Sequence, residues 1–153
     1  MKSNKISFFL LHSFLILISL SLAGQNKKNF SCPINSGTIV IVHDDAYEYG
    51  KRTKDVLIEG QDSNIYSVSS GKVYMVILDS LNQLTTLRIK YKKYVFNYYD
   101  LAGSSVKVGQ SIKRGQLIGK RVIGEKLSFG VYYMKKPIDP FKILECKVEH
   151  VYN

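Results

Sequence analysis

Apolar residues are distributed along this chain in a pattern that indicates β-strands almost throughout. Short runs of alternating or continuous apolar residues are separated by clusters of Gly, Ser, Asn and Asp, as in strands joined by turns. No segment shows a sustained 3.6-residue repeat, so no long amphipathic helix is expected. The predicted strands lie in TIVIVH (38–43), DVLIEG (55–60), IYSVSSGKVYMVIL (65–78), LTTLRIKYKKYVFNYYDL (84–101) and GEKLSFGVYYMKKP (124–137).

Two of these segments contain their own turn, at Ser-Ser-Gly in 65–78 and at Tyr-Lys-Lys in 84–101. IDPFKIL (138–144) closes the pattern, with Pro140 permitting a short helical turn. The chain has 11 Tyr and 7 Phe, which suit half-buried pleated surfaces. We therefore predict an all-β domain, a compact antiparallel β-sandwich or half-barrel.

The first 24 residues are typical of a signal peptide. A basic MKSNK precedes a mostly apolar stretch, and SLAGQ offers small residues for cleavage after Ala23 or Gly24. An uncleaved anchor is the alternative, because the apolar stretch approaches the length that spans a bilayer. We expect an exported protein, periplasmic or extracellular, with a signal peptide (1–24), a leading segment (25–35), one domain (36–144) and a C-terminal tail (145–153).

The chain is basic, with a formal net charge of +10, and removal of Lys2 and Lys5 with the signal peptide leaves +8. An exported basic protein is expected to meet an anionic polymer or a membrane surface and not nucleic acid. Basic pairs such as Lys120–Arg121 form no long run, and we interpret them as solvated faces of strands and turns.

Cys32 and Cys146 are the two cysteines, close to the two ends of the mature chain. Export makes a disulfide between them chemically feasible, but sequence does not give their distance, so the bridge is left open. Two thiols so far apart along the chain, each without a neighbouring ligand residue, are not interpreted as a zinc site.

Four stretches follow one another along the chain in a telling order: CPINSG with YGKR, IYSVSSGKV, NYYDLAGSSVKVGQSIKRGQLIGK, and KLSF followed by IDPFKIL. In this order they resemble the lysostaphin-like (LytM-type) zinc peptidoglycan endopeptidases. The resemblance implies an exported all-β domain and, in catalytic members, one Zn²⁺ held by His-x-x-x-Asp and one His of a His-x-His. Such a metal polarises the scissile carbonyl and activates a water.

Carried over position by position, the resemblance places none of the family's histidines in this chain. Without gaps, the His-x-x-x-Asp pair falls on Thr53 and Leu57, and the His-x-His pair falls on Lys126 and Ser128. The remaining family histidine, expected to be catalytic, falls on Asp100. We therefore expect no zinc and no catalysis.

A shift of two residues would place Asp55 and Glu59 at the first pair, where they and Asp100 offer oxygens to a hard cation such as Ca²⁺. A salt bridge from Lys126 to Asp100 or Glu59 is the favoured alternative. Alternation along KLSF places Lys126 and Ser128 on one face, with Leu127 and Phe129 packing into the core.

The leading hypothesis is therefore a non-catalytic module that binds peptidoglycan or a cell-wall hydrolase. It does not bind nucleic acid, it has no stable membrane span if the signal is cleaved, and its oligomeric state is open. Candidate cleft residues are Asp55, Glu59, Arg88, Lys90, Tyr91, Tyr98, Tyr99, Asp100 and Tyr133, unless the tyrosines only form sheet surface and core.

Two other functions are weighed. An active zinc endopeptidase requires His43 or His150 in the cleft, although both are interpreted as surface or turn residues. A lipoyl- or biotin-carrier-like module shares the turns of VKVGQSIKRGQLIG, but it needs a modified lysine at a hairpin tip, for which YKKY is a poor match.

Overall fold

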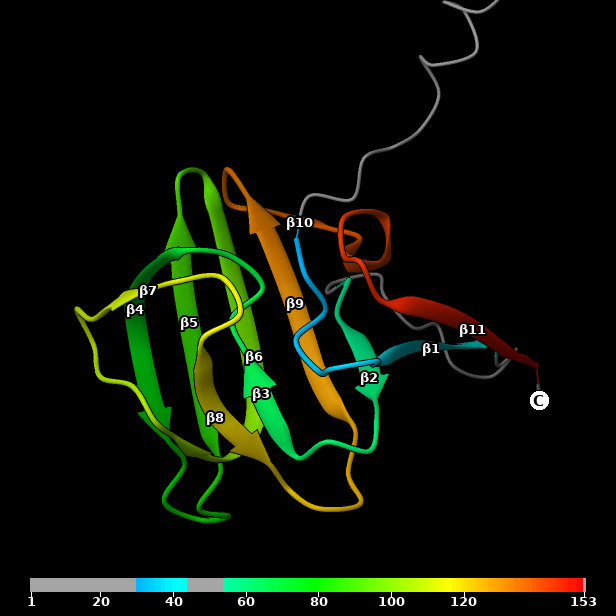
Figure 1. Cartoon of the computed structure of the whole chain (residues 1–153), viewed down its shortest axis with the longest axis horizontal. Coiled ribbons are helices and arrows are strands. Elements are labelled where there is room, and N and C mark those ends of the chain that lie inside the picture. Colours follow the sequence, from blue (N-terminus) through cyan, green and yellow to red (C-terminus); the bar gives the residue numbers. More distant parts are fainter. Residues whose placement is uncertain (1–29, 44–53, 153) are drawn as a thin grey trace, which may run out of the picture.

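The computed structural model describes residues 30–43 and 54–152 (Figure 1). The expected signal peptide and the predicted ligand position Thr53 lie outside these residues. Within the described part, no helix is long and apolar enough to cross a membrane. The elements there are β1 (Thr38–His43), β2 (Val56–Glu59), β3 (Asn64–Tyr66), β4 (Gly71–Leu78), β5 (Thr85–Tyr91), β6 (Tyr94–Ser104), β7 (Ser111–Ile112), β8 (Leu117–Arg121), β9 (Leu127–Tyr133), β10 (Lys136–Ile138), the 3₁₀ turn η1 (Pro140–Lys142) and β11 (Lys147–Tyr152).

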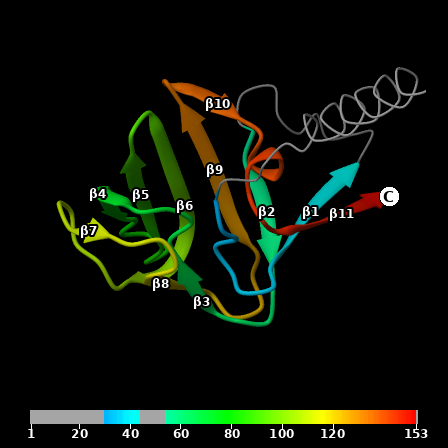
Figure 2. The ribbon, with the colours of Figure 1, turned by 45° about the horizontal axis from the view of Figure 1, so that its top comes forward.

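These strands form one open, mixed sheet with the path β11-β1-β2-β9-β6-β5-β4-β7. The long strand β6 bends the sheet, because its first half pairs with β9 and its last residues, from Leu101 to Ser104, pair with β8. Strand β8 also pairs with β3. In Figures 1 and 2, β3, β7 and β8 therefore lie over the broad sheet β4-β5-β6-β9. The all-β class predicted from the sequence is confirmed.

The hydrophobic core lies between the broad sheet and these short strands. Phe96, Tyr98 and Phe129 are fully buried on the broad sheet and face Val68 and Ile118 from the other side. The Val68 N–H donates a hydrogen bond to Tyr98 Oη at 3.0 Å, and burial raises the pKa of that phenol above its ordinary value. Tyr98 is therefore a core residue and not a cleft residue, whereas the predicted burial of Leu127 and Phe129 is confirmed.

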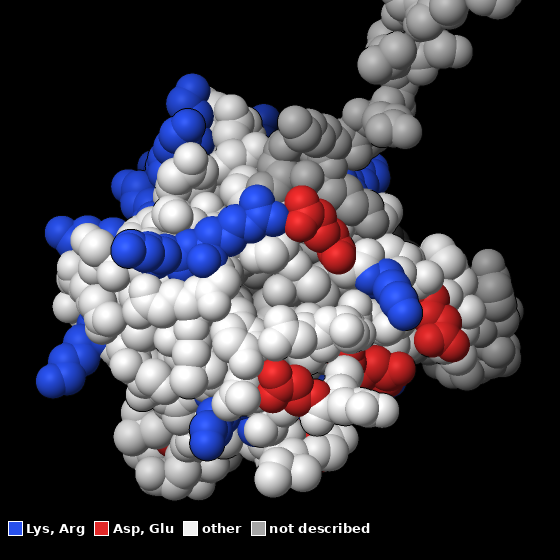
Figure 3. All heavy atoms as spheres, viewed as in Figure 1, with Lys and Arg blue, Asp and Glu red and all other residues white. Residues whose placement is uncertain are grey.

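Charge is unevenly distributed over the surface. In Figure 3, many basic side chains project from the side that carries β4, β5 and β7, and the acidic side chains in view lie mostly away from that side. The sequence of this region explains the asymmetry, since residues 80–124 contain a single acid, Asp100.

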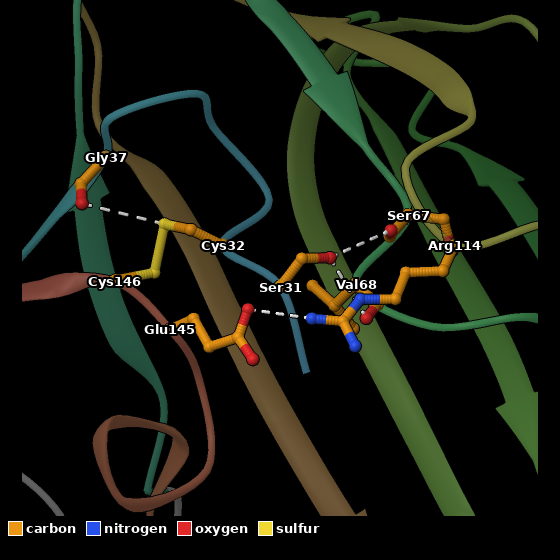
Figure 4. The surroundings of a disulfide bond; sticks show 8 residues. All are labelled: Ser31, Cys32, Gly37, Ser67, Val68, Arg114, Glu145 and Cys146. Atoms are coloured by element: carbon orange, nitrogen blue, oxygen red, sulfur yellow. Dashed lines mark hydrogen bonds and ion pairs between the residues drawn. A yellow bond between two sulfur atoms is a disulfide. The ribbon is translucent and has the colours of Figure 1, made fainter. Parts of the chain in front are cut away.

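A disulfide joins Cys32 to Cys146, with a Cα–Cα distance of 4.8 Å (Figure 4). Beside it, Arg114 pairs with Glu145 at 2.8 Å, and Ser31 Oγ donates to the Val68 carbonyl at 3.1 Å. The Cys32 sulfur also lies 3.6 Å from the Gly37 oxygen, a contact and not a hydrogen bond because a disulfide sulfur has no hydrogen to donate.

The disulfide and a parallel bridge between Phe30 and Leu144 precede the parallel pair of strands in the described sheet. Residues 145–153, expected to be a tail, instead include β11, which pairs in parallel with β1. Strand β1 follows Cys32 along the chain, and strand β11 follows Cys146. The disulfide therefore holds the segments that lead into the two strands close together. Both strands therefore continue two segments that are already aligned in parallel, a long-range arrangement that local sequence does not reveal.

The VKVGQSIKRGQLIGK segment needs glycine where β8 crosses β6. A Cβ at Gly119 would lie 2.5 Å from the backbone oxygen of Gly103, closer than real Cβ contacts allow. Gly119 therefore sets how closely β8 approaches β6, and with it the closure of the curled sheet.

Candidate functional site

The predicted ligand positions meet on the open face, which is the side of β2, β9 and β6 turned away from the core. Along β9, Lys126, Ser128 and Gly130 alternate with the buried Leu127 and Phe129. Ser128 lies directly opposite Leu57 of β2 on one side and Tyr99 of β6 on the other. The sheet register therefore brings together two of the positions that the gap-free alignment selected, Leu57 and Ser128. We call Asp55, Leu57, Glu59, Tyr99, Lys126 and Ser128 the degenerate site.

Lys126 and Glu59 form an ion pair at the lower end of this face. Lys126 Nζ lies 3.4 Å from Glu59 Oε2, and both side chains are about half exposed (41% and 45%). The salt bridge predicted from the sequence is confirmed, with Glu59 and not Asp100 as the partner. Exposed pairs of this kind contribute at most about 1 kcal/mol to stability, so its effect is on the charge of the site.

Asp55 lies against Gly130 and Tyr99 at the other end of the degenerate site. A Cβ on residue 130 would overlap Asp55 Oδ1 and would lie 3.5 Å from a ring carbon of Tyr99, so glycine leaves the room that the carboxylate occupies. Burial raises the pKa of Asp55. Burial also raises the pKa of Tyr99, and the Asp55 charge raises it further while Arg88 opposes the effect.

The row beside Asp55 continues into two polar side chains that the sequence did not single out together. Asn97 of β6 lies opposite both Gly130 and Arg88 of β5. Asn97 Oδ1 and Arg88 Nε are buried, and neither has a hydrogen-bond partner among the described residues. This row is therefore polar and hydrogen-bonding in character, without an imidazole.

Asp100, at the family's catalytic histidine position, lies in an irregular part of β6. Pairing with β5 shifts register between Thr85 and Leu87, so Tyr99 and Asp100 bulge from the ladder. Asp100 is exposed and adopts a left-handed backbone with φ of 57°. The described structure shows no ion pair between Asp100 and Lys126.

Three other predicted cleft residues lie elsewhere. Lys90 and Tyr91 lie at the opposite end of β5, where Tyr91 pairs with Tyr94, about 16 Å along the strands from Ser128. Tyr91 packs against the core. The ring of Tyr133 packs against the ring of Tyr94, with 4.8 Å between the two ring centroids. These placements correct the prediction, because sequence spacing alone did not give the register of the three strands.

Arg121 is a buried residue beside the site whose structural role the sequence interpretation missed. Expected on a solvated face, it is 8% exposed, and its guanidinium donates to the backbone oxygens of Gly60, Asp62 and Glu125. It thereby joins the loop after β2 to the loop before β9, the two segments that carry Glu59 and Lys126. Both loops line an open groove of about 980 Å³. An adjacent Lys-Arg pair gave no signal that only one of its members is buried.

His150, which the alternative of an active zinc enzyme would need in the cleft, lies far from the degenerate site. His150 lies on β11, which β1 and β2 separate from β9, so it is about 14 Å away across the sheet. The side chain of His43 lies outside the described part.

The donors that are described do not fit a zinc ion. Leu57 has no donor atom, Ser128 offers a neutral hydroxyl, and Lys126 brings a positive charge already paired with Glu59. In residues 30–43 and 54–152, no three His, Cys, Asp or Glu side chains come together as a metal-binding group.

Comparison with known proteins shows the family and the fold. The model of peptidase family M23 matches residues 53–140. No curated protein sequence matches the chain. Solved structures with a similar fold include Csd3 of Helicobacter pylori, at 22% identity and a TM-score of 0.61 over 78% of this chain and 34% of that one.

Two further solved structures are similar. A chain of the SpoIIQ–SpoIIIAH pore-forming complex has 18% identity and a TM-score of 0.59, covering 76% of this chain and 91% of that one. Lysostaphin has 20% identity and a TM-score of 0.51, covering 62% of this chain and 45% of that one. The chain thus spans about a third of Csd3 and less than half of lysostaphin, and these likenesses show the fold alone.

Proposed function

The chain belongs to peptidase family M23, and on that premise we propose that it is an exported, non-catalytic member that binds peptidoglycan or regulates a cell-wall hydrolase. The observation that carries this proposal is the Leu57–Ser128 cross-strand pair beside the Lys126–Glu59 ion pair. A hydrocarbon, a hydroxyl and a paired ammonium stand where the family pattern has metal ligands and an imidazole. The framework of the site is retained, but its zinc chemistry is not supported.

The degenerate site offers groups that suit a polar polymer. Tyr99 presents an aromatic ring, Ser128 a hydroxyl and Asp55 a carboxylate, and Asn97 and Arg88 lie in the next row. Peptidoglycan carries sugar hydroxyls and amides that hydrogen-bond with such groups. The net charge of +8 expected after signal cleavage also favours association with anionic wall polymers.

A regulatory role has separate support. A protein of this fold occurs in a complex with SpoIIIAH, so the fold is compatible with a protein partner.

The test is co-sedimentation of the chain from residue 25 onward with purified peptidoglycan sacculi at low and high salt. We expect retention at low salt, reduced by high salt, because the chain is basic. Tyr99→Ala and Lys126→Glu should weaken retention, whereas Lys136→Glu, the same charge change on exposed β10, should weaken it less. No retention at low salt would reject wall binding.

Two further measurements cover the rest of the proposal. Purified wall hydrolases are assayed on sacculi with and without the chain, and unchanged rates would reject the regulatory role. The chain alone is incubated with zinc and dialysed to remove unbound zinc. Its zinc content is then measured, and it is assayed for release of peptides from sacculi. Stoichiometric zinc with peptide release would show an active endopeptidase with a non-standard site and overturn the proposal.

A further inference from the structure

The two edges of the sheet differ in how they are protected. Strand β11 forms one edge and carries the exposed charges Lys147 and Glu149, which discourage pairing with another chain. Strand β4 lies toward the other edge, and VYMVIL (73–78) contains no charged residue. The pairing of β4 with β5 is irregular at Tyr74, but residues 75–78 pair regularly, and an uncharged apolar edge of this kind can pair with another chain.

Much of the outer edge of β4 is unpaired in the described structure. Strand β7 pairs only with Gly71 and Lys72, and Val73 exchanges hydrogen bonds with the nearby loop through Gly109 and Gln110. Beyond Val73, β4 pairs on its inner side with β5 and with no described strand on its outer side. Among the described residues, the outward-facing backbone groups between residues 74 and 78 thus have no strand partner and are available to an added strand.

Apolar side chains border this edge on both faces of the sheet. Ile77, which pairs with Thr86, is 46% exposed, and the adjacent Leu78, which points to the opposite face, is 59% exposed. Tyr74 is 56% exposed, and Leu81 at the tip of the following turn is 94% exposed. A strand added here would cover apolar surface on both sides in addition to forming backbone hydrogen bonds.

Charge indicates the kind of partner. Lys72, at the start of β4, lies opposite Lys90 of β5, and Lys107 is in the loop that bonds Val73. All three are exposed. The ion pairs among described residues use Lys54, Arg114, Lys126 and Lys142, so none of these three lysines has a carboxylate partner there.

We propose that the outer edge of β4 accepts an extended segment of a partner protein as an added strand, with acidic residues at the end beside Lys72 and Lys107. A second copy of this chain fits less well, because antiparallel pairing of two β4 edges would bring toward these lysines only Asp79, which follows β4, and no cluster of acidic residues. This surface lies three strands away from β9, and the proposal does not depend on what the degenerate site binds.

The probes are synthetic, fluorescently labelled peptides with an alternating Val-Thr-Ile centre and either Glu or Lys residues at one end, placed at the N-terminus in one set and the C-terminus in the other. At low salt the Glu-ended peptide should bind the chain from residue 25 onward at least about tenfold more tightly than its Lys-ended counterpart. Amide hydrogen exchange should slow at residues 74–78 on binding.

Matched variants locate the contact. Ile77→Lys should weaken binding about tenfold or more by placing a charge on the edge. Ile123→Lys, the same change at an 87% exposed isoleucine on the loop before β9, should leave binding unchanged. Leu78→Lys is a second edge variant, used if Ile77→Lys melts early. Lys72→Glu with Lys107→Glu should reverse the preference toward the Lys-ended peptide.

Three outcomes would overturn the proposal: equal binding of both peptides, protection of amides outside β4, or a concentration-dependent dimer that Ile77→Lys abolishes, which would assign the edge to a second copy. Retention on sacculi should be the same for wild type and Ile77→Lys. If the chain binds the Glu-ended peptide but not sacculi, the proposed function is rejected and this inference stands. If the chain binds sacculi but not the peptide, this inference is rejected and the proposed function stands.

Discussion

Lys126 Nζ and Glu59 Oε2 lie 3.4 Å apart across the junction of β2 and β9. The same strands set Leu57 directly opposite Ser128, two residues along. The register of β2 and β9 thus accounts for both pairs. It places the Lys126–Glu59 ion pair at the end of the site and the Leu57–Ser128 pair, which does not fit a metal ion, at its centre. The open face therefore holds these strands in a defined register, but the four side chains do not fit a zinc ion.

Restoring ligands should restore metal affinity, because the backbone register is already in place. In Leu57→Asp with Ser128→His, a carboxylate and an imidazole face each other across β2 and β9, a distance suitable for chelation. We expect zinc affinity to rise by about tenfold or more over the wild type, measured by isothermal titration calorimetry. Adding Lys126→Ala should raise it again, since an ammonium then no longer opposes the cation. The pair Leu57→Asn with Ser128→Ala is the control, and equal affinity in all variants would contradict the register.

Asp55 should control the ionisation of Tyr99. Burial, and then the Asp55 charge, raise the pKa of Tyr99, so Asp55→Asn should lower that pKa toward its ordinary value. The measurement is an NMR titration of the Tyr99 ring carbon at alkaline pH. Asp62→Asn is the control, because Asp62 contacts Tyr66 instead, at 3.2 Å. A Tyr99 pKa that does not move in Asp55→Asn would contradict the placement of the carboxylate.

The same carboxylate should affect stability in a pH-dependent way. The pKa of Asp55 is raised above 3.8, so the folded state binds its proton more tightly than the unfolded state does. This contribution to stability is present below the unfolded-state pKa and is lost as pH rises through the folded-state pKa. The unfolding free energy of Asp55→Asn minus that of the wild type should therefore be more favourable to the variant at neutral pH than at acid pH. Urea unfolding at both pH values measures this difference. A difference independent of pH would show that Asp55 is solvated.

Alternation along KLSFGVYY could be predicted from the sequence because a strand has a fixed period of two, and it correctly divided Leu127 and Phe129 from Lys126 and Ser128. The register between strands could not be predicted, since it depends on contacts distant in the chain. That is why Lys90 and Tyr91 were grouped with a site from which they are far removed. The parallel strand β11 was missed for the same reason, as it continues from the disulfide and the Phe30–Leu144 bridge.

Gly119 and Gly103 offer a matched test of the sheet closure. A Cβ at Gly119 would lie 2.5 Å from the Gly103 backbone oxygen, whereas a Cβ at Gly103 would meet nothing within 4 Å. Gly119→Ala should therefore cost about 1–3 kcal/mol of unfolding free energy by overpacking, and Gly103→Ala about 0.5 kcal/mol or less. Equal midpoints of thermal unfolding for the two variants would mean that β8 can move away from β6 without cost.

Arg121 should stabilise the two loops that flank the degenerate site. Its guanidinium satisfies three backbone carbonyls from a nearly buried position, and a lysine reaches fewer of them in that geometry. Arg121→Lys should cost about 1–3 kcal/mol, because buried carbonyls lose charged donors. It should also accelerate hydrogen exchange in residues 60–63 and 122–126 beyond that of the rest of the sheet. Lys120→Ala, next to it and exposed, should change stability by about 0.5 kcal/mol or less, and an equal loss in both variants would reject the role given to Arg121.

The Cys32–Cys146 disulfide should stabilise the domain and hold β11 in place. It links residues 114 positions apart, and closing a loop of that length is worth about 4–5 kcal/mol in the chain-entropy model, which makes that figure an upper estimate. Cys32→Ser with Cys146→Ser should therefore lower the midpoint of thermal unfolding and speed amide exchange first in β1 and β11, the parallel pair that starts at the bridge. Reductant should lower the midpoint of the wild type to that of the double variant and leave the double variant unchanged. If the double variant and wild type unfold at the same midpoint, β11 is held by its strand pairing alone, and the bridge has no part in setting the parallel edge.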